Sequence, residues 1–263
     1  MLQELLPEIC AELGIKCLNL SRNWVHLLTY KNQKRFIIGG NFDLNSAASA
    51  AIASDKVATY QVLDTHKVPA IPHYMVLNDG FTHNLPFKDT ASLKDAILAL
   101  PVVVKPLRGY GGRSVSLCKT QSEAKEAALA LLNTEGSCCI SPYVDSVHEY
   151  RAFFLDDEVL YIYQKTRKTG SFRHNLSSGA HPELMNQDSE LYSSLSTLAN
   201  AAGKALGLRF ATIDMLITTE GPKVLEINRG VYTDVFSKSV PGGREIAKNI
   251  YRKAIAKLFD ISS

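Results

Sequence analysis

Phe210-Ala-Thr-Ile-Asp-Met-Leu-Ile-Thr-Thr-Glu-Gly-Pro-Lys-Val-Leu-Glu-Ile-Asn228 is the stretch of sequence that decides the fold of this chain. Its two mainly apolar segments, residues 210–218 and 223–228, have the composition of strands and flank a turn-forming segment. They therefore predict an antiparallel hairpin. A turn centred on Glu220 places Asp214 opposite Glu226.

Three oxygen-bearing side chains of this hairpin are expected to converge. Residues two apart in a strand share a face, so Glu226 and Asn228 should point the same way while Leu225 and Ile227 enter the core. With Asp214 opposite Glu226, two carboxylates and an amide oxygen form one patch. Such hard oxygen ligands suit Mg²⁺. Taken alone, the pattern fits a solvated hairpin face equally well.

Helices and strands are mixed through the rest of the chain, and several strands form hairpins. Helices are predicted at residues 7–13, 45–54, 55–66, 92–100, 121–132, 189–206 and 244–259. Strands are predicted at residues 15–20, 24–30, 35–38, 74–77, 102–105, 115–118, 149–155 and 159–165. The first helix is expected to hold Pro7 in its first turn. Antiparallel hairpins among helices favour an α+β fold over a doubly wound parallel sheet.

The amino-acid composition is that of an ordinary globular protein. The 263 residues are 46% apolar and 21% charged, with a net charge of +3, which is too small to indicate nucleic acid or a membrane surface. No apolar run reaches the roughly 18 to 20 residues that span a bilayer, and no signal peptide is recognisable at the N-terminus. The five cysteines lack CxxC spacing and are expected to be reduced thiols. A cytoplasmic location is expected.

A second candidate site for chemistry lies near the middle of the chain. The predicted strand 102–105 ends in Lys105 and is followed by a loop at residues 107–113. This loop contains Gly109, Gly111 and Gly112. Backbone N–H groups of such a loop can close over phosphates, and Lys56 and Lys105 would add positive charge. The loop is not a P-loop, because GxxxxGK[ST] is absent, and an ordinary flexible turn would explain it as well.

Together, these motifs and their order resemble the ATP-grasp superfamily. In chain order they are Ser54-Asp-Lys56, Val102-Val-Val-Lys105-Pro with its glycine loop, Glu149-Tyr-Arg151, Phe172-Arg-His-Asn-Leu176, Asp214 and Glu226-Ile-Asn228. The segments 149–151 and 172–176 look most similar to the RimK-like branch, which includes ribosomal-protein glutamate ligases, LysX and cyanophycin synthetase. The resemblance extends from about residue 45 to the end of the chain.

The resemblance implies an α+β ATP-grasp fold in which two lobes hold ATP between them. The expected division is a short N-terminal unit at residues 1–45, a lobe with the glycine-rich lid at 46–139, and a lobe with the magnesium site at 140–263. ATP-grasp enzymes commonly have a larger first domain that helps to hold the acceptor. A different surface, a second copy or a partner protein would therefore complete the acceptor site.

The resemblance also assigns the nucleotide contacts. Adenine would lie against a hinge of Pro142, Tyr143 and Val144, where Pro142 replaces the acidic residue that the family usually has. Glu149 would take the ribose hydroxyls, and Lys56 and Lys105 the phosphates. The loop glycines Gly109, Gly111 and Gly112 would cover the phosphates.

Metal ligands and catalytic residues follow from the same matches. Asp214, Glu226 and Asn228 correspond to the Mg²⁺ ligands, with Mn²⁺ as a possible substitute. Arg173 and Asn175 match residues over the phosphate and the activated carboxylate, and Lys105 joins them in catalysis.

Two basic features leave alternatives open. Arg151 is expected on the opposite face of its strand from Glu149, and either supports the site or pairs within the sheet. The basic run at residues 165–168 fits a solvated loop or a surface that attracts an acidic substrate. Use of residues 165–174 to bind nucleic acid is disfavoured by the modest net charge.

The implied activity is ATP-dependent ligation of a carboxylate to an amine through an acyl phosphate. The substrates would be an amino acid, a peptide or a related small carboxylate, together with an amine; neither a membrane nor nucleic acid is expected as a partner. An ATP-binding regulatory module without catalysis is the alternative. Asp214→Ala and Glu226→Ala are expected to abolish ADP release with the fold intact.

Overall fold

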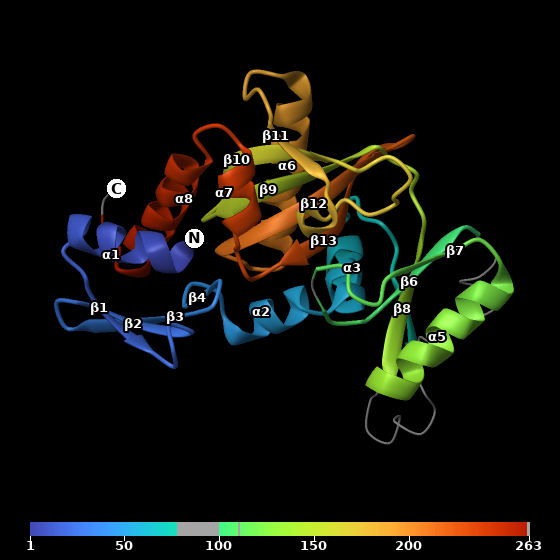
Figure 1. Cartoon of the computed structure of the whole chain (residues 1–263), viewed down its shortest axis with the longest axis horizontal. Coiled ribbons are helices and arrows are strands. Elements are labelled where there is room, and N and C mark those ends of the chain that lie inside the picture. The colour runs from blue at the N-terminus through green and yellow to red at the C-terminus, as the bar shows by residue number, and fades with distance from the viewer. Residues whose placement is uncertain (78–99, 110, 262–263) are drawn as a thin grey trace.

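The computed structural model describes residues 1–77, 100–109 and 111–261, which form three antiparallel sheets with helices packed against them (Figure 1). This arrangement confirms the predicted α+β class. The predicted helix at 92–100 lies almost wholly outside the described residues. Within the described ranges, no helix is both long and apolar enough to cross a membrane.

The N-terminal sheet is covered on one face by the first and last helices of the chain (Figure 1). Its strands are β1 (Lys16–Leu20), β2 (Val25–Tyr30), β3 (Gln33–Ile38) and β4 (Asn41–Phe42). The covering helices are α1 (Leu2–Glu12) and α8 (Gly243–Leu258). Residues near the two ends of the chain thus share one hydrophobic core.

The start predicted for the first helix is wrong. Helix α1 begins at Leu2 and contains Pro7 in its interior. Leu2, Leu5, Leu6 and Ile9 form a continuous buried stripe, which explains why the helix extends ahead of the proline despite the hydrogen bond that proline removes.

A second sheet has the order β5-β8-β6-β7. Its strands are β5 (Tyr74–Leu77), β6 (Val102–Lys105), β7 (Ser116–Cys118) and β8 (Ser137–Pro142). Helix α5 (Gln121–Glu135) packs against it, while α2 (Ala47–Ala53) and α3 (Lys56–Thr65) lead into it from the N-terminal sheet. A capping box of Thr120 and Glu123 begins α5, and Gly136, with φ of 72°, ends it.

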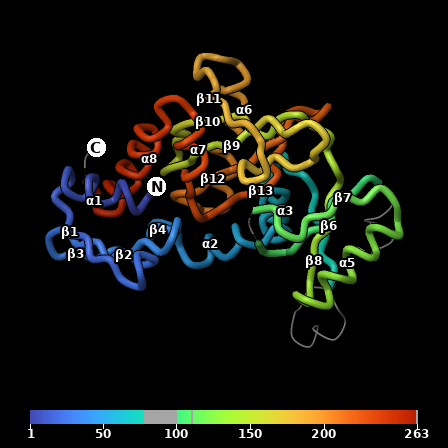
Figure 2. The backbone as a smooth tube through the Cα atoms, in the orientation of Figure 1, coloured from blue at the N-terminus to red at the C-terminus, as the bar shows by residue number. Residues whose placement is uncertain are grey.

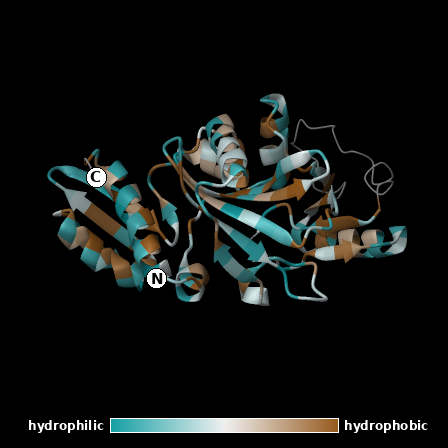
Figure 3. Cartoon of the chain, turned by 90° about the horizontal axis from the view of Figure 1, so that it is seen from above, coloured by the Kyte–Doolittle hydropathy of each residue, from teal (hydrophilic) through white to brown (hydrophobic). Residues whose placement is uncertain are grey.

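The largest sheet has the order β11-β10-β9-β12-β13 and forms the body of the molecule (Figure 2). Its strands are β9 (His148–Leu155), β10 (Glu158–Thr166), β11 (His181–Leu184), β12 (Phe210–Thr218) and β13 (Gly221–Asn228). Helix α6 (Glu190–Ala205) packs on one face; the 3₁₀ turn η2 (Leu176–Ser178) and helix α7 (Asp234–Ser239) complete the described elements. Apolar residues occur in the elements of all three sheets (Figure 3), consistent with a hydrophobic core at each.

Most predicted strands are confirmed to within two residues, whereas β4, β11, η2 and α7 were not predicted, and β8 was expected only at its end, as part of the hinge. β8 ends in Pro142 and β11 carries Pro182, and proline disfavours strands, while α7 has only 6 residues. Their conformations depend on neighbours in space: β8 pairs with β5 and β6, and β11 pairs with β10.

Candidate functional site

A cleft lies between the β5–β8 sheet and the five-stranded sheet. Its space, counted with the open solvent at its mouth, is about 980 Å³. Most of the residues singled out from the sequence line it, namely Lys56, Lys105, Gly109, Gly111, Gly112, Pro142, Tyr143, Val144, Glu149, Arg173, Asn175 and Glu226. Asp214 and Asn228 do not line the cleft directly; they lie beside Glu226.

The β12–β13 hairpin places Asp214 directly opposite Glu226, as predicted. Nearer the turn, however, Met215 pairs with Val224, so a bulge at Leu225 shifts the register by one residue. Without this bulge Asp214 would face Leu225. The bulge also turns Leu225 toward the cleft, which corrects its predicted place in the core.

Asn228 connects the two carboxylates. Its Nδ2 donates to Asp214 Oδ2 and to Glu226 Oε1, at 3.3 Å in each case. The three predicted metal-ligating side chains are therefore together. The cluster of Asp214, Glu226 and Asn228 offers a metal two carboxylates and one amide. Among the described residues there is no group of three or more His, Cys, Asp or Glu side chains that could hold a metal.

Arg151 lies on the same face of β9 as Glu149, which corrects its predicted place on the opposite face. Residues two apart in a strand share a face, and the spacing of 149 and 151 should have indicated this. Arg151 forms a bidentate ion pair with Asp214, with Nε 2.7 Å from Oδ1 and a terminal nitrogen 2.5 Å from Oδ2. The pairing joins β9 to β12, where Arg151 is opposite Asp214.

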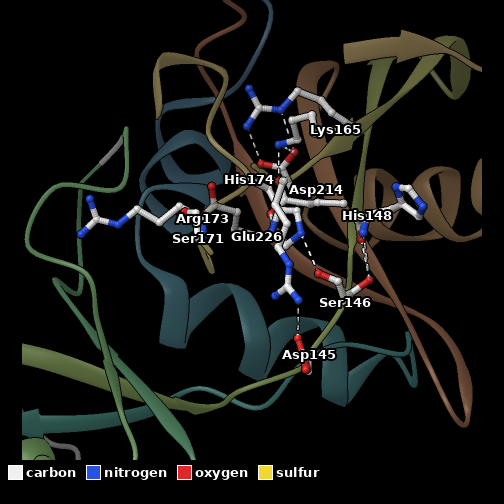
Figure 4. A network of polar contacts seen from close by, with 12 residues as sticks. Asp145, Ser146, His148, Lys165, Ser171, Arg173, His174, Asp214 and Glu226 are labelled. Atoms are coloured by element: carbon white, nitrogen blue, oxygen red, sulfur yellow. Dashed lines mark hydrogen bonds and ion pairs between the residues drawn. The ribbon is translucent and has the colours of Figure 1, made fainter. Parts of the chain in front are cut away.

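Lys165, on β10, completes a buried charge network (Figure 4). Its Nζ donates to Asp214 Oδ1 at 3.1 Å and also to Glu149 Oε1. Burial by itself would raise the pKa of Asp214, but the charges of Arg151 and Lys165 outweigh burial and hold that pKa well below its usual range. The network was not predicted: Lys165 was expected as the last residue of a strand and the first of a basic run, and no local pattern indicates its partners on β9 and β12.

The basic run at 165–168 is therefore not one solvated surface. Lys165 is buried, and Arg167 donates to Tyr143 Oη at 2.8 Å and to Asp145 Oδ1 at 2.7 Å. Arg167 thus braces the segment that follows β8. Lys168 is exposed, as a solvated loop residue would be.

His174 holds the segment 172–176 against the start of β9 (Figure 4). Its Nε2 lies 2.9 Å from the Ser146 carbonyl oxygen, and its Nδ1 lies 3.6 Å from Glu149 Oε2. Because a carbonyl oxygen only accepts, Nε2 must be the protonated nitrogen. Burial lowers the pKa of His174, which favours the neutral ring.

The end of the cleft near β6 is positively charged. Lys105 is buried there, and Lys56 Nζ donates to the carbonyl oxygens of Pro106 and Gly109 at 3.3 and 3.4 Å. Burial lowers the pKa of Lys105. Lys56, Lys105 and Arg173 contact no carboxylate in the part of the chain that the structure describes, so their charge is available to an anionic ligand.

The glycine loop touches the segment 172–176 across the cleft. A Cβ built on Gly112, which has φ of +69°, would lie 2.7 Å from Asn175 Oδ1. Arg173 also donates from a terminal nitrogen to the Val115 carbonyl oxygen at 3.0 Å. Two segments that follow strands of different sheets therefore meet at the cleft, which both of them line.

The predicted hinge lies at the side of the cleft. Tyr143 N–H donates to the Pro101 carbonyl oxygen at 3.0 Å, which ties the hinge to the start of β6. Val144 N–H makes no hydrogen bond to another described residue. Pro142, Tyr143 and Val144 all line the cleft, so Val144 N–H is available to a ligand.

Comparison with known proteins supports the resemblance seen in the motifs. A model of the RimK-like ATP-grasp domain matches residues 53–254. A protein of Pseudomonas fluorescens named "Probable alpha-L-glutamate ligase" is 28% identical over 197 residues, which cover 74% of this chain and 62% of that protein. A Shewanella denitrificans protein named "Probable alpha-L-glutamate ligase 1" is 29% identical, over 74% of this chain and 63% of its own length. The chain thus spans less than two thirds of the length of these relatives.

Solved structures show the same fold at lower identity. D-alanine--D-alanine ligase from Bacillus anthracis, solved with ATP, is 20% identical with a TM-score of 0.61, over 82% of this chain and 68% of that one. A bifunctional glutathione synthetase from Pasteurella multocida is 17% identical with a TM-score of 0.58, over 95% of this chain and 44% of that one.

Proposed function

Because the chain belongs to the RimK-like ATP-grasp domain family, we propose that it is an ATP-dependent ligase that joins a carboxylate to an amine. The observation that carries this proposal is the distribution of charge in the cleft. Lys56, Lys105 and Arg173 have no carboxylate partner among the described residues, and they share the cleft with Glu226. Cations without partners suit a polyphosphate.

The proposed nucleotide site uses the hinge at one end and the lysines at the other. Adenine would lie against Pro142, Tyr143 and Val144, with the Val144 N–H as a donor to the ring. Glu149 would accept from the ribose hydroxyls. The phosphates would reach Lys56 and Lys105 beneath Gly109, Gly111 and Gly112.

Asp214, Glu226 and Asn228 are the proposed holders of Mg²⁺, for which Mn²⁺ would substitute. Two carboxylates and an amide fit an ion that takes few protein ligands and fills its remaining positions with water and phosphate oxygens. When bound, such an ion supplies positive charge next to the phosphates. Arg151 and Lys165 hold the pKa of Asp214 low, so its carboxyl group is ionised, as a metal ligand must be.

In the proposed reaction, a carboxylate oxygen of the substrate attacks the γ-phosphorus, and ADP leaves. The amine then attacks the carbonyl carbon of the acyl phosphate, phosphate leaves, and the nitrogen loses a proton to give the amide. Arg173 would stabilise the charge on the transferred group, and Asn175 and Lys105 would position it. No nucleophile from the protein is required.

We propose an amino acid as one substrate, since the curated relatives carry the name alpha-L-glutamate ligase. L-Glutamate is therefore the first amine to test. The other substrate would be the carboxylate of an amino acid, a peptide or a related small acid.

An ADP-release screen tests the proposed function. Pairs of amino acids, and glutamate with short peptides, are incubated with ATP and Mg²⁺, and products are weighed by mass spectrometry. A product equal to both substrates minus water, with one ADP per product, is the expected result. ATP binding without turnover for any pair would favour the non-catalytic module instead.

Gly112→Ala is expected to weaken ATP binding by about tenfold. The new Cβ would push the Asn175 side chain away and separate the glycine loop from the segment 172–176. Gly111→Ala is the matched control, since Gly111 has φ of +74° but nothing within 4 Å of a built Cβ. Both changes strain the backbone, and only one creates the clash. Calorimetric titration with a non-hydrolysable ATP analogue measures the difference; equal affinities would show that the loop contact is not needed.

A further inference from the structure

The segment 172–176 directs neighbouring side chains to opposite sides. Arg173 and Asn175 reach toward the glycine loop, whereas His174, between them, reaches the segment before β9 (Figure 4). Asn175 has an extended backbone, with φ of -69° and ψ of 129°, and successive side chains of an extended chain point in opposite directions. The reaction proposed above uses Arg173 and Asn175 and gives no function to His174.

The contacts of His174 decide which of its ring nitrogens can accept a hydrogen bond. Its Nε2 lies 2.9 Å from the Ser146 carbonyl oxygen, so Nε2 carries the proton of the neutral ring. Burial lowers the pKa of His174, which favours that neutral ring over the charged one. Nδ1 is therefore an acceptor, and it belongs to a residue that lines the cleft.

The neighbour of this nitrogen is a second acceptor. Nδ1 lies 3.6 Å from Glu149 Oε2, and an unprotonated Nδ1 has no proton to donate to it. The other oxygen of Glu149, Oε1, accepts from Lys165 Nζ in an ion pair that requires the carboxylate form. Burial raises the pKa of Glu149, and the charge of Lys165 opposes that rise. Two acceptors therefore lie side by side on residues that are each 8% exposed.

Two adjacent hydroxyl groups, as in the diol of a ribose, would satisfy both acceptors. Each hydroxyl brings one donor, and a buried acceptor that lacks a donor costs free energy. The position also suits a sugar. Ser146 follows the hinge at 142–144, where adenine is proposed to lie, and Lys56 and Lys105 line the part of the cleft proposed for the phosphates.

We propose that His174 is a specificity-determining residue for the nucleotide: its Nδ1 accepts from one ribose hydroxyl while Glu149 Oε2 accepts from the other. The inference rests on the proposed function, because it requires ATP in the cleft, and it refines that function by dividing the two hydroxyls between two residues. Such a site selects ribonucleotides, since a missing hydroxyl leaves one buried acceptor unpaired.

Two substitutions of His174 separate the functions of its nitrogens. In His174→Gln the amide nitrogen takes the place of Nε2 and keeps the hydrogen bond to Ser146, but no acceptor takes the place of Nδ1. In His174→Asn the amide oxygen takes the place of Nδ1, and the bond to Ser146 is lost. The asparagine variant is therefore the matched control.

The affinities for ATP, 2′-deoxyATP and 3′-deoxyATP are measured by calorimetric titration with Mg²⁺, without carboxylate or amine substrates. The wild-type protein should bind ATP at least about fivefold more tightly than either deoxynucleotide, as expected for the loss of one hydrogen bond. His174→Gln should bind ATP and one of the two deoxynucleotides equally well and still discriminate against the other. His174→Asn should discriminate against both.

The outcomes distinguish the inference from the proposed function. An equal loss of affinity for all three nucleotides in His174→Gln, or no loss, would show that Nδ1 takes no hydroxyl, and the inference alone would be wrong. Equal binding of the three nucleotides by the wild-type protein would also contradict it. A wild-type protein that binds none of them would overturn the proposed function and the inference together. Circular dichroism checks that each variant is folded.

Discussion

Replacement of Glu226 by alanine is expected to lower Mg²⁺-dependent ADP release by at least about 100-fold, or about 2.7 kcal/mol of activation free energy. Its carboxylate lines the cleft beside Asp214 and Asn228, so the proposed metal site would lose one of its two acids. The free energy of unfolding should fall by only about 1 kcal/mol, because Glu226 is half-buried and accepts from Asn228 alone among the described residues. Steady-state kinetics and urea unfolding measure the two quantities.

Glu220→Ala is the control for this experiment. Glu220 is an acid of the same hairpin, but it lies exposed in the turn and pairs with Lys223. It should retain wild-type ADP release. Normal turnover by the Glu226 variant would show that this carboxylate takes no part in the reaction and would remove the proposed metal site.

Replacement of Asp214 by alanine is expected to destabilise the protein as well as inactivate it. Asp214 is 1% exposed and pairs with both Arg151 and Lys165, so its loss leaves the partly buried Arg151 and the buried Lys165 with one fewer partner each. Breaking a buried ion pair in this way costs about 3–5 kcal/mol. The expectation that the fold stays intact therefore holds for Glu226→Ala and not for Asp214→Ala.

A double-mutant cycle separates the ion pair from other effects. Urea unfolding is compared for Asp214→Ala, Arg151→Met and the double variant. The double variant should lose less stability than the two single losses combined, by about 1 kcal/mol or more, because the second change removes the unpaired charge. Strictly additive losses, or an Asp214 variant as stable as the wild type, would contradict the assigned network.

Much of the fold was predictable because its signals are local. The apolar segments 210–218 and 223–228 indicated their hairpin, and Gly207 marked the end of the helix before it. Thr120 and Glu123, three residues apart, form the capping box at which α5 begins, and the sequence shows both residues directly. The boundaries predicted for the three domains remain predictions, although α1 and α8 share a core.

The candidate site shows the limit of local signals. Asp214 was correctly placed opposite Glu226, but only because the bulge at Leu225 compensates for a turn that is centred half a residue earlier than expected. The position of a bulge depends on how the whole sheet packs, and no residue type in the hairpin indicates it. The same bulge brings Leu225 into the cleft.

The sequence by itself determined the order of the motifs, the hairpin with its three oxygen-bearing side chains, and the family to which the chain belongs. The tertiary structure alone decided that Arg151 and Lys165 neutralise Asp214, and that His174 lies between Ser146 and Glu149. Turns, caps and periodicity depend on residues close together in the chain. Ion pairs between strands and contacts between a loop and a sheet depend on which distant segments pack together, and only the folded chain brings those segments into contact.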